Sequence, residues 1–163
     1  MSIYFHKESV SIEFNEDLVS NWINSCISEV SKITGDLSVI FCNDEYLKTI
    51  NIKYLNHDYY TDIITFDYSE KDTISGDLFI SIDRVIENAK LNNVHFINEL
   101  YRVIIHGVLH LCGYNDKTVK EKKEIREKEN FFLNIIVWFS DVYVVSRETI
   151  MLKKYDIVVV GVR

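Results

Sequence analysis

Two histidines spaced four residues apart are the side chains of this chain best suited to chemistry. His106 and His110 stand in the run HGVLHLCGYND. On a helix this spacing places both imidazoles on one face, one turn apart, so that both can reach a single ion. Gly113 permits a positive backbone dihedral that ends the helix and turns the chain back. We therefore predict Asp116 as a third metal ligand.

Two neutral imidazoles and one carboxylate suit one zinc ion with a coordination position left to water, which is typical of a catalytic site. Histidines bonded to backbone carbonyls inside a core are the competing interpretation, and spacing alone leaves both open. The metalloprotease signature HExxH has the same histidine spacing, but its general base is the glutamate. Position 107 is glycine, so a metalloprotease-like hydrolase is a disfavoured alternative.

Hydrophobic periodicity predicts the elements that must position these residues. Alternating or short apolar runs predict strands at 2–14 (an edge strand or hairpin), 37–42, 63–68 and 78–82, the last after a break at 75–77. Repeats of three or four predict helices at 15–33, 44–54, 83–91, 97–111 and 117–136. Asn15 should cap the first helix and Gly35 should end it. The broadly apolar histidine helix should be the central buried one.

Composition limits the class of protein. At 163 residues, with 47% hydrophobic and 26% charged residues, the chain suits one globular domain. A net charge of −7 excludes a positive field over the whole surface, so a polyanion must be held locally. Three cysteines without a CxxC argue against disulfides and thiolate zinc sites and favour the cytoplasm. We expect no signal peptide and no contact with a membrane, because no apolar run is long enough.

Three stretches resemble the YbeY family of rRNA-maturation endoribonucleases. The run 106–116 is similar to the family motif HGxLHLxGY, which is followed by a third ligand, usually histidine. The run 51–66 resembles LNxxYRxxDxxTDVLSF, and 76–81 resembles GDIxIS. The resemblance covers residues 1–136. It implies an α+β fold: a single domain with a small, mostly parallel sheet, one antiparallel strand, and a central metal-binding helix.

The resemblance also implies a function. It implies a zinc-dependent endoribonuclease in rRNA maturation and ribosome quality control, in which a water activated by one zinc ion hydrolyses an RNA phosphodiester. The ligands carried over are His106, His110 and Asp116. The implied partners are rRNA or other single-stranded RNA, together with a ribosomal subunit or assembly proteins. A non-catalytic ribosome-assembly factor with a structural metal remains an alternative.

Two positions depart from the family pattern. Asp116 replaces the usual histidine ligand, an exchange of nitrogen for oxygen that zinc tolerates. Leu55 stands where the family has an arginine, so the expected phosphate-binding charge is missing. Arg102, four residues before His106 and on the same helical face, is the candidate catalytic cation, with Lys53 as another.

RNA needs a local basic surface on this acidic chain. The candidates are residues 117–128 and a cleft lined by Lys53, His57 and Arg102. Because charged helices usually present a solvated face, we favour the cleft, with only a few phosphate contacts. His6, His57 and His95 are interpreted as surface residues.

Residues 137–163 lie outside the resemblance and are predicted to be an appended C-terminal extension. MLKKYDIVVVG at 151–161 resembles the first strand of an FAD-binding Rossmann protein, but no GxGxxG follows, so we predict no dinucleotide site. The alternative is a hairpin of 141–146 against 155–160.

Overall fold

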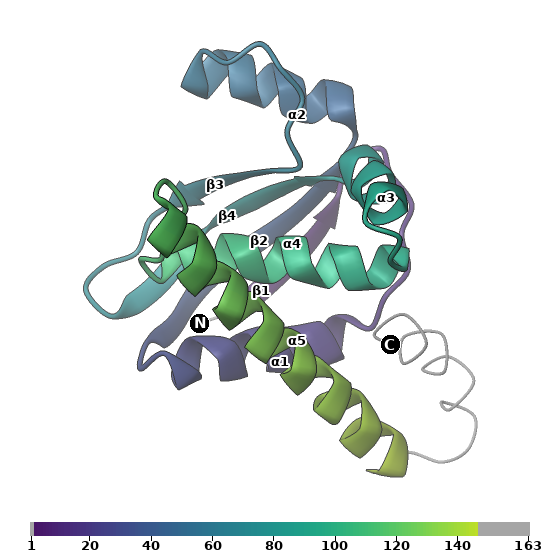
Figure 1. The fold of residues 1–163 in the computed structure, drawn as a ribbon, viewed down its shortest axis with the longest axis vertical. Helices are drawn as coiled ribbons and strands as arrows, with labels where there is room; N and C mark the ends of the chain where they lie inside the picture. Colours follow the sequence, from purple (N-terminus) through teal and green to yellow (C-terminus); the bar gives the residue numbers. More distant parts are fainter. Residues whose placement is uncertain (1, 147–163) are drawn as a thin grey trace.

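The computed structural model of the chain describes residues 2–146, and its strands form one sheet in the order β1-β2-β4-β3 (Figure 1). The strands are β1 (Ser2–Lys7), β2 (Ile33–Cys42), β3 (Ile63–Asp67) and β4 (Thr73–Ser81). β2 pairs in parallel with β1 and β4, whereas β3 runs antiparallel to β4. This confirms the mostly parallel sheet with one antiparallel strand.

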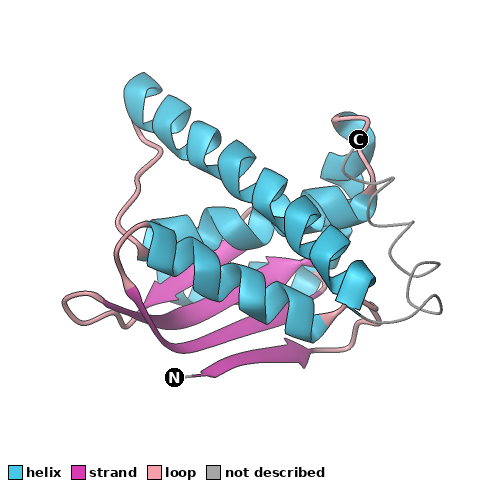
Figure 2. Cartoon of the chain, turned by 90° about the horizontal axis from the view of Figure 1, so that it is seen from below, coloured by secondary structure: helices cyan, strands magenta, loops and turns pink. Residues whose placement is uncertain are grey.

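Helices cover the sheet, and Figure 2 shows several of them stacked on one of its faces. They are α1 (Glu16–Glu29), α2 (Asp44–Ile50), the π-helical turn η1 (Asn51–Leu55), α3 (Ile82–Leu91), α4 (Phe96–Leu111) and α5 (Val119–Ser146). α4 contacts β3, β4, α1, α3 and α5. The histidine helix is therefore central, as predicted.

The period of two in β4 separates two apolar layers. Leu78 and Ile80 belong to the main core beneath α1, α4 and α5, whereas Phe79 packs in a second cluster with Leu47 of α2. α2 and η1 therefore cover the opposite face, at the β3 end of the sheet.

Gly107 sets how closely α4 approaches this sheet. A Cβ atom at this position would lie 2.6 Å from Ile63 Cδ1 and 2.9 Å from Leu78 Cδ2. A side chain here would push α4 away from β3 and β4.

Several predicted boundaries were wrong. β1 ends at Lys7 and pairs in parallel with β2, so there is no hairpin in 2–14. Gly35 lies inside β2 and does not end α1; a Cβ there would lie 2.1 Å from Ser75 Oγ, next to a register shift between Thr34 and Leu37. The glycine is explained by close approach of neighbouring strands.

Two further predicted boundaries differ from those in the structure. β4 begins at Thr73, so 75–77 is strand and not a break. The helix predicted at 44–54 is α-helical only to Ile50 and continues as η1. The predicted cap of α1 was correct, because Asn15 Oδ1 accepts a hydrogen bond from Leu18 N at 2.9 Å.

The last described residues of the chain are helical. α5 continues to Ser146, so a strand at 141–146 was wrong, and 155–160 lies outside the described residues. The domain boundary after residue 136 stays a prediction. Within residues 2–146, no helix combines the length and the hydropathy that a membrane span requires.

Candidate metal centre

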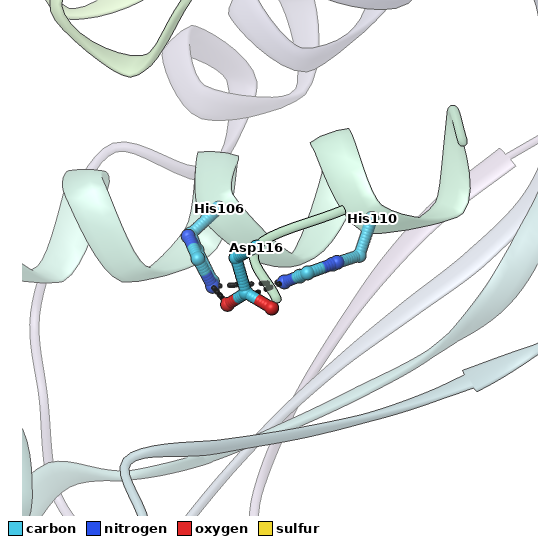
Figure 3. Close-up of side chains that lie close together, drawn as sticks. All are labelled: His106, His110 and Asp116. Atoms are coloured by element: carbon cyan, nitrogen blue, oxygen red, sulfur yellow. Dashed lines mark hydrogen bonds and ion pairs between the residues drawn. The ribbon is translucent and has the colours of Figure 1, made fainter. Parts of the chain in front are cut away.

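The end of α4 and the turn after it bring three donor groups together (Figure 3). The Nε2 atoms of His106 and His110 lie 3.0 Å apart. Asp116 Oδ2 lies 3.5 Å from the first and 3.4 Å from the second. These three predicted residues thus offer ligand atoms within 4.8 Å of one another, close enough to hold a metal ion.

The protonation of the two rings fits a cation. His106 Nδ1 lies 2.6 Å from the Glu129 carboxylate, and His110 Nδ1 lies 2.9 Å from the carbonyl oxygen of Tyr114. Because these acceptors require an N–H on Nδ1, Nε2 is the atom of each ring that is available to an ion, and it faces the other Nε2 and Asp116. Tetrahedral zinc ligands stand roughly 3.3–3.5 Å apart, close to the spacing of these donors.

The turn that delivers Asp116 is a Schellman motif. Tyr114 N donates to Leu109 O and Gly113 N donates to His110 O, each at 3.0 Å, with Gly113 at φ +97°. A Cβ on Gly113 would meet nothing within 4 Å, so the dihedral angle is what requires glycine. The same turn presents the Tyr114 carbonyl to His110, which couples helix termination to the orientation of the ligand.

Glu129 of α5 was missed by the sequence analysis. Its side chain is 4% exposed, and Oε2 lies 3.0 Å from Arg102 Nη1 and 3.4 Å from Arg126 Nη1. Burial lowers the pKa of His106, but the Glu129 hydrogen bond and charge outweigh it and raise that pKa overall. Burial raises the pKa of Glu129, whereas His106 lowers it, and the net result is a lowered pKa. The sequence did contain one signal for this role: Glu129 is an acid on the otherwise apolar face of the helix predicted at 117–136.

Arg102, the predicted catalytic cation, is occupied by neighbouring side chains. Its Nη1 bonds to Glu129, and its Nη2 donates to Asn130 Oδ1 at 3.0 Å. Arg102 therefore holds Glu129, which in turn holds His106.

The donor cluster borders two hollows. The α4–α5 hollow, about 470 Å³, contains His106 and Asp116 together with four basic side chains, those of Arg102, Lys122, Lys123 and Arg126, and with three further acidic ones, those of Asp62, Glu99 and Glu129. The loop hollow, about 560 Å³, contains the three donor residues together with residues of η1, β3 and the loop between them, including Leu55, His57 and Tyr59.

Asp62 lines both hollows. Burial raises the pKa of this carboxyl, while the nearby His106 lowers it, and the net direction is upward. The sequence indicated Asp62 only through the family resemblance.

The predicted RNA cleft was wrong as a single site. Arg102 lines the α4–α5 hollow, His57 lines the loop hollow, and Lys53 lines a third hollow with Tyr54 and Phe66. Lys53 Nζ lies 5.0 Å above the Tyr54 ring. Leu55 borders the loop hollow without supplying a charge.

Among the described residues, the cysteines lie outside the donor cluster. Burial raises the pKa of Cys42 to about 12 and that of Cys112 to about 11. Cys112 packs against the main core, beside the site.

Comparisons with known proteins identify the family. The family model described as "Endoribonuclease YbeY" matches residues 3–137. A protein named "Endoribonuclease YbeY" from Azobacteroides pseudotrichonymphae is 49% identical over 128 residues, covering 78% of this chain and 92% of the relative. One of the same name from Parabacteroides distasonis is 48% identical over 137 residues, covering 83% and 96%.

A solved structure shares the fold. The solution structure of TM1509 from Thermotoga maritima has a TM-score of 0.63 and 24% sequence identity, covering 91% of this chain and 97% of that one. Because the family model spans most of the chain and the relatives share nearly half of the aligned residues, this chain belongs to the endoribonuclease YbeY family.

Proposed function

We propose that this protein is a zinc-dependent endoribonuclease that hydrolyses single-stranded RNA in rRNA maturation and ribosome quality control. The observation that carries the proposal is the cluster of His106 Nε2, His110 Nε2 and Asp116 Oδ2, with separations of 3.0 to 3.5 Å. Family membership supplies the substrate class. The donor set would hold one zinc ion.

The chemistry divides between the ion and the protein. When bound, zinc lowers the pKa of water and withdraws charge from a phosphoryl oxygen. Glu129 and the Tyr114 carbonyl can accept hydrogen bonds from Nδ1 of the two histidines, which leaves their Nε2 atoms as the ones that face an ion. Asp62 borders both hollows beside His106, where a carboxylate can accept a proton from attacking water.

The α4–α5 hollow is the side on which we place RNA phosphates. Lys122, Lys123 and Arg126 line it next to His106 and Asp116. Four acidic side chains line the same hollow, and Arg102 and Arg126 are paired with Glu129, so the attraction for a phosphate comes from the exposed Lys122 and Lys123. These lysines would take the place of the arginine that the resemblance implies at Leu55.

Partners and compartment follow from the same proposal. An rRNA substrate implies contact with a ribosomal subunit or with assembly proteins. The three cysteines of the described residues are unpaired, which supports the reducing cytoplasm.

Replacement of one ligand tests the proposal. We expect His110→Ala to lose bound zinc, measured by elemental analysis, and to abolish cleavage of single-stranded RNA. His95→Ala is the matched control, because His95 is an exposed histidine that precedes α4 and makes no side-chain cap bond. Full cleavage by metal-stripped protein would contradict the proposal.

A non-catalytic assembly factor with a structural metal is the second candidate, and Leu55 in the loop hollow favours it. Under this alternative, His110→Ala would lower the melting temperature strongly. Under the catalytic proposal the melting temperature changes little, because the three ligands come from one helix and its turn. A metalloprotease lacks support, since the space at Gly107 excludes a glutamate.

A further inference from the structure

Two aromatic rings stack in the loop between η1 and β3. The ring centroids of His57 and Tyr59 are 5.2 Å apart with an interplanar angle of 21°. Tyr59 is 55% exposed. Both residues line the loop hollow together with His106, His110 and Asp116. An aromatic pair is thus presented to solvent beside the donor cluster.

A buried side chain holds this pair in place. Asn51 is 1% exposed. Its Nδ2 donates to the Tyr59 carbonyl at 3.0 Å, and its backbone oxygen accepts from His57 N at 3.2 Å. The Tyr59 hydroxyl lies 3.0 Å from His57 Nδ1. The pair is therefore preorganised although it stands on a loop.

Neighbouring tyrosines are engaged differently. Tyr54 packs edge-on against Phe66 at 5.4 Å. Lys48 Nζ and the Arg84 guanidinium lie 5.0 and 5.6 Å from the centroid of Tyr60, whose hydroxyl bonds to Glu45.

Tyr59 has fewer partners. Among the described residues, His57 is its one ring partner, and no cation covers it. One face of the stacked pair is left for a ligand.

We propose that the His57–Tyr59 pair is a stacking platform for an unpaired nucleobase of the RNA whose phosphate lies at the donor cluster. The inference rests on the proposed function and adds a base-binding subsite to it. Bases stack on aromatic rings without regard to sequence, and only a base outside a duplex exposes its face. Phosphates beside Lys122 and Lys123 in the α4–α5 hollow and a base on the loop side would place the strand across the three donors.

The test measures binding of an oligoribonucleotide carrying 2-aminopurine, whose fluorescence is quenched on stacking. The full chain is used metal-free, so that no cleavage occurs. We expect Tyr59→Ala to weaken single-strand binding about tenfold and to reduce the quench. Tyr59→Phe keeps the ring and should bind within about twofold of the unmodified protein. His57→Ala provides a second disruption of the stack and should also weaken binding.

The controls separate stacking from other effects. Tyr4→Ala removes an exposed tyrosine from β1, at the far edge of the sheet from β3, and should leave binding unchanged. A duplex of the same sequence should bind Tyr59→Ala and the unmodified protein equally. If Tyr59→Ala binds single strands as tightly as the unmodified protein, or Tyr59→Phe loses as much as Tyr59→Ala, the platform is wrong.

RNA cleavage by the zinc-loaded protein distinguishes a failure of the stacking platform from a failure of the proposed nuclease function. If Tyr59→Ala cleaves RNA as efficiently as the unmodified protein, the stacking platform is wrong and the nuclease proposal is unaffected. Absence of RNA cleavage in the zinc-loaded unmodified protein would overturn both.

Discussion

At the scale of single residues, one buried acid, Glu129, supports the donor cluster from behind His106. Glu129 contacts His106 through one oxygen and Arg102 and Arg126 through the other. A carboxylate behind a ligating histidine fixes the ring orientation and raises its basicity. The two arginines offset the cost of burying this charge.

Removal of that charge should weaken zinc binding. We expect Glu129→Gln to lower zinc affinity about 10- to 100-fold, measured by competition with a chromophoric chelator. Because Glu129 raises the His106 pKa, protons compete with zinc from a higher pH in the unmodified protein. The variant should shift the loss of zinc binding to lower pH. Glu127→Gln, an exposed acid of the same helix, is the control, and equal affinities in both variants would contradict this role.

Asp62 should affect turnover and leave the metal in place. We expect Asp62→Asn to reduce the rate of RNA cleavage about 10²- to 10⁴-fold, the usual contribution of a general base. Zinc content should remain that of the unmodified protein, because Asp62 lies outside the donor cluster. Normal cleavage by Asp62→Asn would exclude the proton-accepting role.

At the scale of elements, the donor geometry depends on how α4 lies against the sheet. Gly107 faces Ile63 and Leu78, whereas its neighbour His106 faces Glu129 of α5. One turn of α4 thus contacts the sheet on one side and α5 on another. A displacement of α4 would change the core and the candidate site together.

Replacement of Gly107 tests this packing. We expect Gly107→Ala to lower the free energy of unfolding by about 1–3 kcal/mol, because its Cβ overpacks the space against Ile63. Urea denaturation measures the change. Gly113→Ala provides a comparison, since its Cβ has free space and only the positive φ opposes it. An unchanged stability of Gly107→Ala would show that α4 can move freely.

At the scale of the whole molecule, charge is distributed unevenly. The net charge is −7, and the hollow beside the donor cluster holds acidic and basic side chains in equal number, yet Lys122 and Lys123 are exposed there. Long-range repulsion and local attraction for RNA therefore oppose each other. Salt screens both interactions. The slope of log affinity against log salt nevertheless counts the phosphate contacts, because each contact releases counterions from the RNA.

RNA binding should accordingly weaken with salt through a few contacts only. We expect Lys122→Ala to reduce the magnitude of the slope of log affinity against log salt by about 0.7, the value for one phosphate on a single strand. Filter binding at several salt concentrations gives the slope. Lys90→Ala, in the last turn of α3, should leave it unchanged. Equal slopes for both variants would place the RNA elsewhere.

The sequence by itself determined the donor cluster and most elements of the fold. His106, His110 and Asp116 lie within one helix and its turn, so local helix geometry and one positive φ suffice to bring them together. The family resemblance implied the α+β class, and periodicity predicted the individual helices and strands. These features depend on neighbours in the chain, which is why a linear pattern predicts them.

Only the tertiary structure decided which distant side chains surround that cluster. Glu129 reaches His106 through the packing of α5 on α4, and Asp62 and Tyr59 arrive through the loop that precedes β3. The parallel pairing of β1 with β2, in place of a hairpin, is likewise a contact across about thirty residues. Such contacts are selected by the shape and burial of the whole core, and no local spacing encodes them.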